Sequence, residues 1–276
     1  MSVPATAELF IIGNELLIGE IRDSNSHWLC REIHSLGGRV TRATILRDEL
    51  DVIASELRSA LGRGPRLIIT SGGLGPTADD MTLVAVALGT GCQLGLNQTA
   101  LAMIRQRYDE LTSRGVLGEG GINPAREKMA WLPAGAVPLE NPVGTAPGVL
   151  LGHGETTIVC LPGVPSELEG IFVTSLQPLL GSIFAAGLSR LRTITVSCND
   201  ESIMEPVLSS VSRDHPLVYI KSLATTIDET REIDIRLTAS GDVEAEVCVM
   251  LEAAVSDLQD GLSGLGLANW ERIDSE

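Results

Sequence analysis

The feature that most constrains the fold is an alternation of short β-rich runs with amphipathic helical patterns along the first part of the chain. Runs of branched apolar residues are followed by stretches in which apolar residues recur at helical spacing. In chain order, the sequence predicts a strand at Leu9–Ile12, a helix from about Ser24, a strand at Val40–Ile45, a helix at Leu50–Leu61 and a strand at Leu67–Thr70. This order is typical of a parallel sheet whose strands are joined by helical crossovers.

The alternation continues to about residue 180. Further on, we expect a helix that has Thr77 as its N-cap and runs to about Leu88, a helix at Asn97–Arg114, a hairpin of Gly148–Leu151 with Thr157–Leu161, and a helix at Ser166–Leu180. The connection GEGGINPAREKMAWLPAGA, which follows the second of these helices, is polar and has little regularity. Long loops of this kind are often functional.

A different pattern begins near residue 190. There the sequence predicts a strand at Arg192–Ser197, a helix at Glu201–Val211, strands at Leu217–Ser222 and Glu232–Thr238, and a helix at Val243–Leu258. A βαββα order of this kind forms a small α+β unit of its own. We therefore predict a mostly parallel α/β domain at 1–182, an α+β domain at 190–262 and a frayed tail at 263–276.

Composition narrows the class of partner. The formal net charge is −16, so the field of the whole protein repels polyanions and anionic lipid surfaces. We expect no nucleic-acid partner and no membrane partner. The five cysteines are scattered without a CxxC pair, which suggests neither a disulfide framework nor a zinc site. The amino-terminal segment lacks the features of a signal peptide, and these observations together predict a cytoplasmic protein.

The stretch TSGGLGPTADDMT, residues 70–82, places a glycine-rich loop directly after the third expected strand. A loop that leaves a parallel strand and enters a helix aims backbone N–H groups at one spot, which suits a phosphate group. Gly72, Gly73 and Gly75 would let the backbone approach that ligand closely. The loop matches neither the Walker motif nor the dinucleotide fingerprint, and a tight structural turn explains its composition equally well.

Two aspartates, Asp79 and Asp80, follow the loop. Acidic residues in a first helical turn complement the helix dipole, which is one explanation for them. The other explanation is electrostatic, because a phosphate group beside two carboxylates is repelled unless a cation lies between them. Mg²⁺ binds one or two carboxylates together with phosphate oxygens and water, and other divalent cations accept the same oxygen ligands. The loop and the aspartates together therefore predict a divalent-metal and phosphate site.

Four motifs, IIGNELLIGEIRDSNSHWL, TSGGLGPTADDMT, NPVGTAPG and LPGVPSEL, occur in this order between residues 11 and 168. They resemble the signature motifs of the amino-terminal domain of the CinA family (competence/damage-inducible protein A), which is itself similar to the molybdopterin-binding domains of the MoaB/MogA type. The second expected domain is similar in pattern to the KH-like middle domain of that family. The resemblance implies a three-layer, mostly parallel, molybdopterin-binding-domain-like fold with a smaller α+β domain, and a homodimer.

What the resemblance implies for function is metal-dependent hydrolysis of the pyrophosphate of ADP-ribose to AMP and ribose 5-phosphate. The implied substrate contacts are Ser71, Gly72, Gly73, Leu74, Gly75, Thr77, Asn25, Gly144 and Thr145, and Thr82 would support the helix that Thr77 caps. The implied metal ligands are Asp79, Asp80 and Glu167. Glu15 joins the two aspartates as a catalytic residue, because loops that follow parallel strands gather at one edge of the sheet.

Some of these residues have structural explanations as well. NPVGTAPG is also a turn made rigid by two prolines, Glu167 also suits a helix dipole, and Asn25 also suits a helix start. The chain departs from the family motifs at Asn14, Ala78 and Met129, where the family commonly has Thr, Lys and Gln. Loss of the cation at position 78 is expected to weaken phosphate binding more than metal binding.

Three hypotheses follow for the function. The preferred one is a Mg²⁺-dependent hydrolase of a nucleoside diphosphate sugar, with ADP-ribose as the implied substrate. The second is molybdopterin binding or adenylylation, which the same fold and glycine loop permit, and the third is a regulatory domain that binds a nucleotide without turning it over. In the CinA family, nicotinamide mononucleotide deamidase activity belongs to a carboxy-terminal domain outside these 276 residues, so it is not assigned. The second domain lacks a GxxG loop and is acidic, so we expect it to serve in packing or dimerisation rather than RNA binding.

Overall fold

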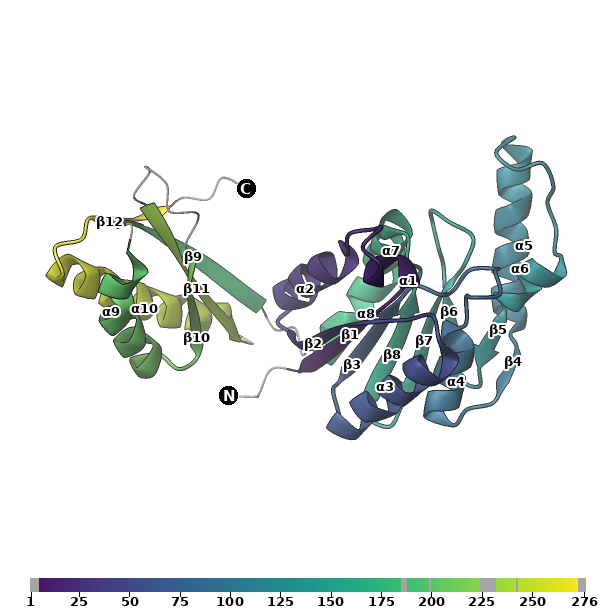
Figure 1. Ribbon diagram of the computed structural model, residues 1–276, viewed down its shortest axis with the longest axis horizontal. Coiled ribbons are helices and arrows are strands. Elements are labelled where there is room, and N and C mark those ends of the chain that lie inside the picture. Colours follow the sequence, from purple (N-terminus) through teal and green to yellow (C-terminus); the bar gives the residue numbers. More distant parts are fainter. Residues whose placement is uncertain (1–4, 185–187, 199, 224–231, 242, 273–276) are drawn as a thin grey trace. The chain divides into compact units, whose positions relative to one another are not determined.

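The computed structural model describes residues 5–184, 188–198, 200–223, 232–241 and 243–272. Contacts divide the chain into two compact units. The larger unit contains residues 5–34 and 38–184, and the smaller unit contains residues 185–276 together with 1–4 and 35–37. The helices and strands of both units are labelled in Figure 1.

A six-stranded sheet forms the centre of the larger unit, with the strand order β2-β1-β3-β8-β7-β6. The strands are β1 (Thr6–Ile12), β2 (Arg39–Leu46), β3 (Leu67–Ser71), β6 (Val137–Leu139), β7 (Gly148–His153) and β8 (Thr156–Leu161). The pairs β1–β2, β1–β3 and β3–β8 are parallel, and β7 and β6 continue the sheet in antiparallel pairing. The mostly parallel sheet expected from the sequence is confirmed, including the hairpin that joins β7 to β8.

Helices cover both faces of this sheet (Figure 1). They are α1 (Asn14–Leu17), α2 (Asn25–Ser35), α3 (Leu50–Arg63), α4 (Thr82–Thr90), α7 (Pro165–Ile171) and α8 (Gln177–Ile183), with a π-helical turn η1 (Phe172–Leu176) between the last two. Phe10 and Ile12 of β1 pack in one core cluster with α3 and α4. Helices α2, α7 and α8 lie on the opposite face, where the Trp28 and Phe172 rings meet edge to face with centroids 5.0 Å apart. Six of the seven β1 residues are buried, as expected for a strand covered on both sides.

An arm, defined here as residues 94–133, extends the larger unit beyond the sheet (Figure 1). It consists of β4 (Leu94–Leu96), α5 (Gln98–Ser113), α6 (Pro124–Lys128) and β5 (Trp131–Pro133). The sequence predicted only an irregular connection over the last part of the arm, and that was wrong. Helix α6 is short but well started, because the Asn123 side chain accepts a hydrogen bond from Arg126 N at 2.9 Å and Pro124 begins the helix. Strand β5 exists because β4 supplies its antiparallel partner.

The smaller unit is a four-stranded antiparallel sheet in the order β10-β11-β9-β12 with two helices. Its elements are β9 (Leu188–Ser197), α9 (Glu201–Asp214), β10 (Val218–Leu223), β11 (Glu232–Gly241), α10 (Glu244–Gly264) and β12 (Asn269–Arg272). The helices and one sheet face share a core cluster that includes Ile194, Ile235 and Leu258. The expected frayed tail is corrected by β12, which pairs with β9 and so satisfies the backbone groups along that side of the strand. No helix among the described residues has the length and apolar character needed to cross a membrane.

Candidate functional site

The loops of the candidate site meet at one edge of the large sheet, where β1, β2, β3 and β8 end. Backbone hydrogen bonds join neighbouring loops there: Gly13 N donates to Leu46 O at 3.1 Å, and Gly72 N donates to Leu161 O at 2.9 Å. Because β7 is antiparallel to β8, the loop that precedes β7 lies at the same edge. The edge therefore collects segments from five parts of the chain, as expected for the carboxyl ends of parallel strands.

The glycine loop after β3 has no room for side chains at its first two glycines. A Cβ on Gly72 would lie 2.1 Å from Ile12 O, and one on Gly73 would lie 2.3 Å from Thr82 Oγ1. Both residues have positive φ, at 111° and 67°. The Thr82 hydroxyl donates to Gly72 O at 2.8 Å, so this buried threonine, which was expected to support the helix, holds the loop.

The backbone amides of the loop divide into two groups. The amide of Gly72 donates to Leu161 O and is not available to a ligand. The expected phosphate contact by this amide is therefore corrected. Among the described residues, no hydrogen-bond acceptor is found for the amides of Gly73, Leu74 and Gly75. The Leu74 side chain is buried in the core, 4% exposed, so it holds the loop from below and leaves only its amide for binding. Three consecutive unpartnered N–H groups in a loop with positive φ can receive an anion.

The turn after the glycines is closed by Thr77 and the aspartates, and it is not helical. Thr77 N donates to Asp80 Oδ2 at 2.8 Å, and Asp80 N donates to Thr77 O at 3.2 Å. Helix α4 begins at Thr82, so the predicted N-cap at Thr77 is wrong by about one helical turn. The physical reason is that these side chains hydrogen-bond the local backbone and so compete with the helix. Since α4 has no acidic residue in its first turn, the helix dipole does not explain Asp79 and Asp80.

Three carboxylates that follow three different strands lie close enough at this edge for two of them to shift the pKa of the third. Asp79 accepts from the Thr77 hydroxyl at 2.5 Å, and this bond, its own backbone amide and nearby Lys128 hold the pKa of Asp79 below its ordinary value. The pKa of Asp48 is raised, mainly by burial and also by the charges of Glu15 and Asp79, although the Asn14 amide opposes this by donating to Asp48 at 2.8 Å. Glu15 lies folded over Gly13, where an added Cβ would be 2.3 Å from Glu15 Oε1. The structure thus brings Glu15 and Asp79 together with Asp48, which the sequence analysis missed.

Asp48 could have been found from its position. It is the second residue after β2, and the rule that placed Glu15 at this edge applies equally to the loop after β2.

A divalent cation fits the chemistry of these side chains only as a partly protein-bound ion. Within the described ranges, no group of three or more His, Cys, Asp or Glu side chains is arranged to hold a metal. Asp79 and Asp80 offer two adjacent carboxylates beside an anion-binding loop. Mg²⁺ commonly uses one or two carboxylates plus phosphate oxygens and water, so this donor set fits an ion that arrives with a phosphorylated ligand.

The segment NPVGTAPG forms a loop held by side chains on both sides. Arg107 of α5 donates to three of its carbonyls, those of Pro142 at 3.0 Å, Val143 at 2.6 Å and Gly144 at 2.9 Å. Asn141 Oδ1 accepts from the amides of Val143 and Gly144 at 3.0 and 2.8 Å. The loop is therefore shaped by Arg107 and Asn141 more than by its prolines.

Glu167 lies beneath this loop rather than with the aspartates. Its Oε2 accepts from Asn141 Nδ2 at 2.7 Å, and a Cβ on Gly144 would be 1.9 Å from the same oxygen. This contact gives Glu167 a role in positioning the loop, and nothing among the described contacts joins it to Asp79 or Asp80. Thr145 is near the Tyr108 hydroxyl, at 3.4 Å, and is half-buried.

Asn25 and Ser71 connect strand ends to one another. Asn25 Nδ2 donates to Ser71 Oγ at 2.9 Å and to Gly163 O at 2.8 Å, while the Ser71 hydroxyl donates to Pro162 O at 3.2 Å. Both side chains are buried, Asn25 being 8% exposed. Both hydrogens of the Asn25 amide are used inside the protein, which leaves its Oδ1 as the atom able to meet a ligand.

Comparison with known proteins decides the family. The family model described as "Probable molybdopterin binding domain" matches residues 8–182, well over half of the chain. The chain belongs to the molybdopterin-binding domain family. A relative from Aeropyrum pernix is 44% identical over 216 residues, 78% of each chain, and one from Pyrobaculum calidifontis is 37% identical over 254 residues, 92% of this chain and 94% of the relative.

A solved structure of the protein CinA, with unknown function, from Thermoplasma acidophilum is also similar. It is 36% identical, has a TM-score of 0.56, and covers 65% of this chain and 99% of its own. The CinA-like character expected from the four motifs is thereby confirmed for this molybdopterin-binding domain.

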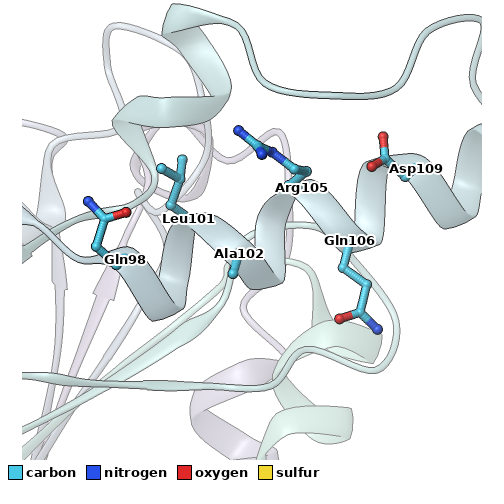
Figure 2. Close-up of a pocket in the computed structure, with 6 residues that line it drawn as sticks. All are labelled: Gln98, Leu101, Ala102, Arg105, Gln106 and Asp109. Atoms are coloured by element: carbon cyan, nitrogen blue, oxygen red, sulfur yellow. The ribbon is translucent and has the colours of Figure 1, made fainter.

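Two surface depressions of this family member lie away from the glycine loop. One is lined by side chains of α5 alone, namely Gln98, Leu101, Ala102, Arg105, Gln106 and Asp109 (Figure 2). The other is lined by residues 93–97 and 132–135 around the β4–β5 pair. Neither contains a residue of the glycine loop or of the Thr77 turn, so these depressions do not define the candidate site.

The presence of Met129, where the family commonly has Gln, affects the candidate site less than expected. Its side chain is 2% exposed and belongs to the main core cluster, so it packs inside the unit. A side chain in this position does not reach a ligand at the surface. Asn14, at the start of α1, and Ala78, on the loop after β3, are both exposed.

Proposed function

We propose that the larger unit is a metal-dependent hydrolase of a nucleoside diphosphate sugar, with ADP-ribose as its substrate. The observation that carries the proposal is the pairing of three unpartnered amides, those of Gly73, Leu74 and Gly75, with Asp79 and Asp80 on the same loop. An anion-binding loop with adjacent carboxylates would be self-defeating for a phosphate alone. It is suited to a phosphate that comes with a divalent cation.

In the proposed reaction, water adds to one phosphorus of the diphosphate and the P–O–P bridge breaks, which gives AMP and ribose 5-phosphate. The amides of Gly73, Leu74 and Gly75 bind and orient a phosphate group, and Asp79 and Asp80 hold the cation. When bound, the cation supplies charge neutralisation and water activation. Thr77 keeps both carboxylates in place, since its hydroxyl lies 2.5 Å from Asp79 Oδ1 and 2.6 Å from Asp80 Oδ2. Catalysis of phosphoryl transfer relies on such positioning and charge stabilisation.

Asp80→Asn tests the proposal. The variant keeps a side-chain oxygen for the Thr77 amide but loses the charge that binds a cation, so we expect folding to be retained and AMP formation to fall by about a hundredfold or more. The measurement is AMP release from ADP-ribose at limiting Mg²⁺. Asp260→Asn, the same substitution at an exposed position on α10 of the smaller unit, should leave the rate unchanged. Full activity of Asp80→Asn under limiting Mg²⁺ would contradict the assignment.

Molybdopterin binding, with or without adenylylation, is the second candidate, and the family description of residues 8–182 favours it. The same three amides would then hold the phosphate of the pterin. Incubation of the pure protein with ATP and molybdopterin distinguishes the candidates, because adenylylated pterin would support the second and AMP from ADP-ribose the first. Saturable binding of either ligand without any product would instead support a regulatory, non-catalytic domain.

A further inference from the structure

A lysine of the arm reaches the turn that follows the glycine loop. Lys128, the last residue of α6, donates a hydrogen bond from Nζ to Thr77 O and interacts electrostatically with the Asp79 carboxylate. In the part of the chain that the structure describes, no other lysine or arginine forms a hydrogen bond or ion pair with residues 72–80. Lys128 is therefore the cationic side chain that contacts the Thr77 turn beside Asp79.

The backbone beneath Lys128 is held firmly. The Arg126 guanidinium stacks on the Tyr108 ring at 3.9 Å and donates to Gly120 O at 2.6 Å and to Gly121 O at 2.8 Å. On the other side, Met129 is anchored in the core. A half-buried lysine side chain on a fixed backbone can exchange one acceptor for another without movement of the arm.

The choice of lysine at this position is itself informative. Of the 20 basic residues in the chain only Lys128 and Lys221 are lysines. Two arginines of the arm, Arg107 and Arg126, use their guanidinium groups to bind several carbonyls at once. Lysine instead provides a compact charge on a flexible stem with three donors, which suits a phosphate that comes and goes.

We infer that Lys128 binds the ligand's second phosphate group, so that the site selects a diphosphate over a single phosphate. This inference rests on the proposed function only in assuming that a phosphorylated ligand occupies the glycine loop. One phosphate lies on the amides of Gly73, Leu74 and Gly75, and the other takes the place of Thr77 O as the acceptor for Lys128 Nζ. A neutral carbonyl is a weaker partner for an ammonium group than a phosphate oxygen, so the exchange is favourable.

Binding of inorganic pyrophosphate and inorganic phosphate, each with Mg²⁺, tests the inference by calorimetry on the full chain. Lys128→Ala should weaken pyrophosphate binding about tenfold or more, because it removes a charge-assisted hydrogen bond, while phosphate binding changes little. Lys128→Arg should recover part of the loss. The matched control is Arg105→Ala, which removes the same charge from α5 and from the surface shown in Figure 2, at a side chain with no described contact to the loop. Equal pyrophosphate affinity for Lys128→Ala and the wild type would overturn the inference.

Because the chain has only two lysines, a second readout can be measured on the wild-type chain. Reductive ¹³C-methylation labels Lys128, Lys221 and the terminal amine, and Lys128→Arg assigns the first signal. Pyrophosphate should shift the Lys128 resonance and leave that of Lys221, on β10 of the smaller unit, unchanged. An unshifted Lys128 signal at saturating pyrophosphate, or no pyrophosphate binding by the wild type, would overturn the inference as well.

These results are separable from those that test the hydrolase. Lys128-dependent pyrophosphate binding without turnover of ADP-ribose would sustain the inference and contradict the proposed function. Turnover of ADP-ribose with equal rates and KM in the wild type and Lys128→Ala would do the reverse.

Discussion

At the scale of single residues, steric clashes explain why the loop after β3 needs glycines. Gly73 combines a φ of 67° with a Cβ position 2.3 Å from Thr82 Oγ1. Gly91, which ends α4, has a φ of 71° but no atom within 4 Å of its Cβ position. The two glycines share the same backbone requirement and differ in the space around them.

Gly73→Ala and Gly91→Ala therefore separate the two effects. Both should lose about 1 kcal/mol of unfolding free energy for an alanine in the left-handed region. Gly73→Ala should lose about 1–3 kcal/mol more, because Thr82 must move and release its bond to Gly72 O. Urea unfolding measures both, and pyrophosphate binding should be impaired only in Gly73→Ala. Equal destabilisation of the two variants would mean that the loop has more freedom than its contacts indicate.

The partly buried carboxylate of Asp48 reduces the stability of the folded protein at neutral pH. Its pKa in the folded protein is raised above the ordinary value near 3.8, mainly by burial. The folded state therefore holds the proton more tightly than the unfolded state, so the stability linked to Asp48 is fully present below pH 3.8 and is lost as the pH rises through the raised pKa. A residue kept at such a cost beside Glu15 and Asp79 is suited to a functional role.

Asp48→Asn should accordingly stabilise the protein slightly at pH 7, because the variant removes a partly buried charge. The gain should shrink as the pH is lowered toward the ordinary aspartate value. Urea midpoints across this pH range measure it. Asp51→Asn, in the first turn of α3, is the control and should be neutral or slightly destabilising because its charge complements the helix dipole. A gain that does not depend on pH would contradict the linkage.

At the scale of elements, the sequence predicted the order of the sheet and helices of the larger unit because burial imposes a clear period on each. β1 and β3 are buried along almost their whole length, and α3 has buried residues at helical spacing. What it did not predict depends on partners distant in the chain. β5 forms because β4 lies beside it, and β12 because β9 does. The start of α4 was misplaced for a local reason, because Thr77 looks like an N-cap but hydrogen-bonds Asp79 and Asp80 in a turn before the helix.

The helix expected at Ser166–Leu180 shows a third kind of difference. It contains a π-helical turn, Phe172–Leu176, which ends two residues before Pro178. Proline has no backbone N–H to donate and crowds the preceding turn, which explains a widened turn at this point. Within the candidate site, the sequence identified the loop and its carboxylates, but which amides are free could be known only from the structure.

One polar contact joins β1 to α3, and it is unusually buried. Glu8 lies within β1 and is 3% exposed, and Arg63 at the end of α3 donates to both of its oxygens at 2.8 and 2.6 Å. Arg63→Ala should destabilise the protein by about 3 kcal/mol, because it leaves a buried carboxylate without its partner. The double variant Glu8→Gln with Arg63→Ala should regain a large part of that loss, since the uncompensated charge is then absent. Thermal unfolding measures both, and an additive double variant would show that the pair is not coupled.

At the scale of the whole molecule, the net negative charge repels the anionic ligand that the candidate site is proposed to bind. A net charge of −16 disfavours anionic ligands at long range. The amides of the glycine loop, Lys128 and a bound cation can offset this repulsion only at short range. We therefore expect the affinity for pyrophosphate to depend strongly on Mg²⁺. The homodimer implied by the resemblance stays a prediction, which sedimentation of the pure protein would check.

Each of the two units has a hydrophobic core of its own, one around Phe10 and Ile53 and the other around Ile235 and Leu258. We therefore expect thermal unfolding to show two transitions. Removal of residues 263–276 takes β12 away from β9, so it should lower the transition of the smaller unit and leave that of the larger unit in place.

Ligand binding should act on the other transition. Because a ligand that binds only the folded state adds RT ln(1 + [L]/Kd) to its stability, Mg²⁺ with pyrophosphate at about a hundred times Kd should add about 2.7 kcal/mol to the larger unit alone. Calorimetry on the full chain and on the shortened chain measures both effects. A shift of the transition that the removal of β12 lowers would place the ligand in the smaller unit, and a shift of neither transition would show that the ligand does not bind; either result would contradict binding at the glycine loop.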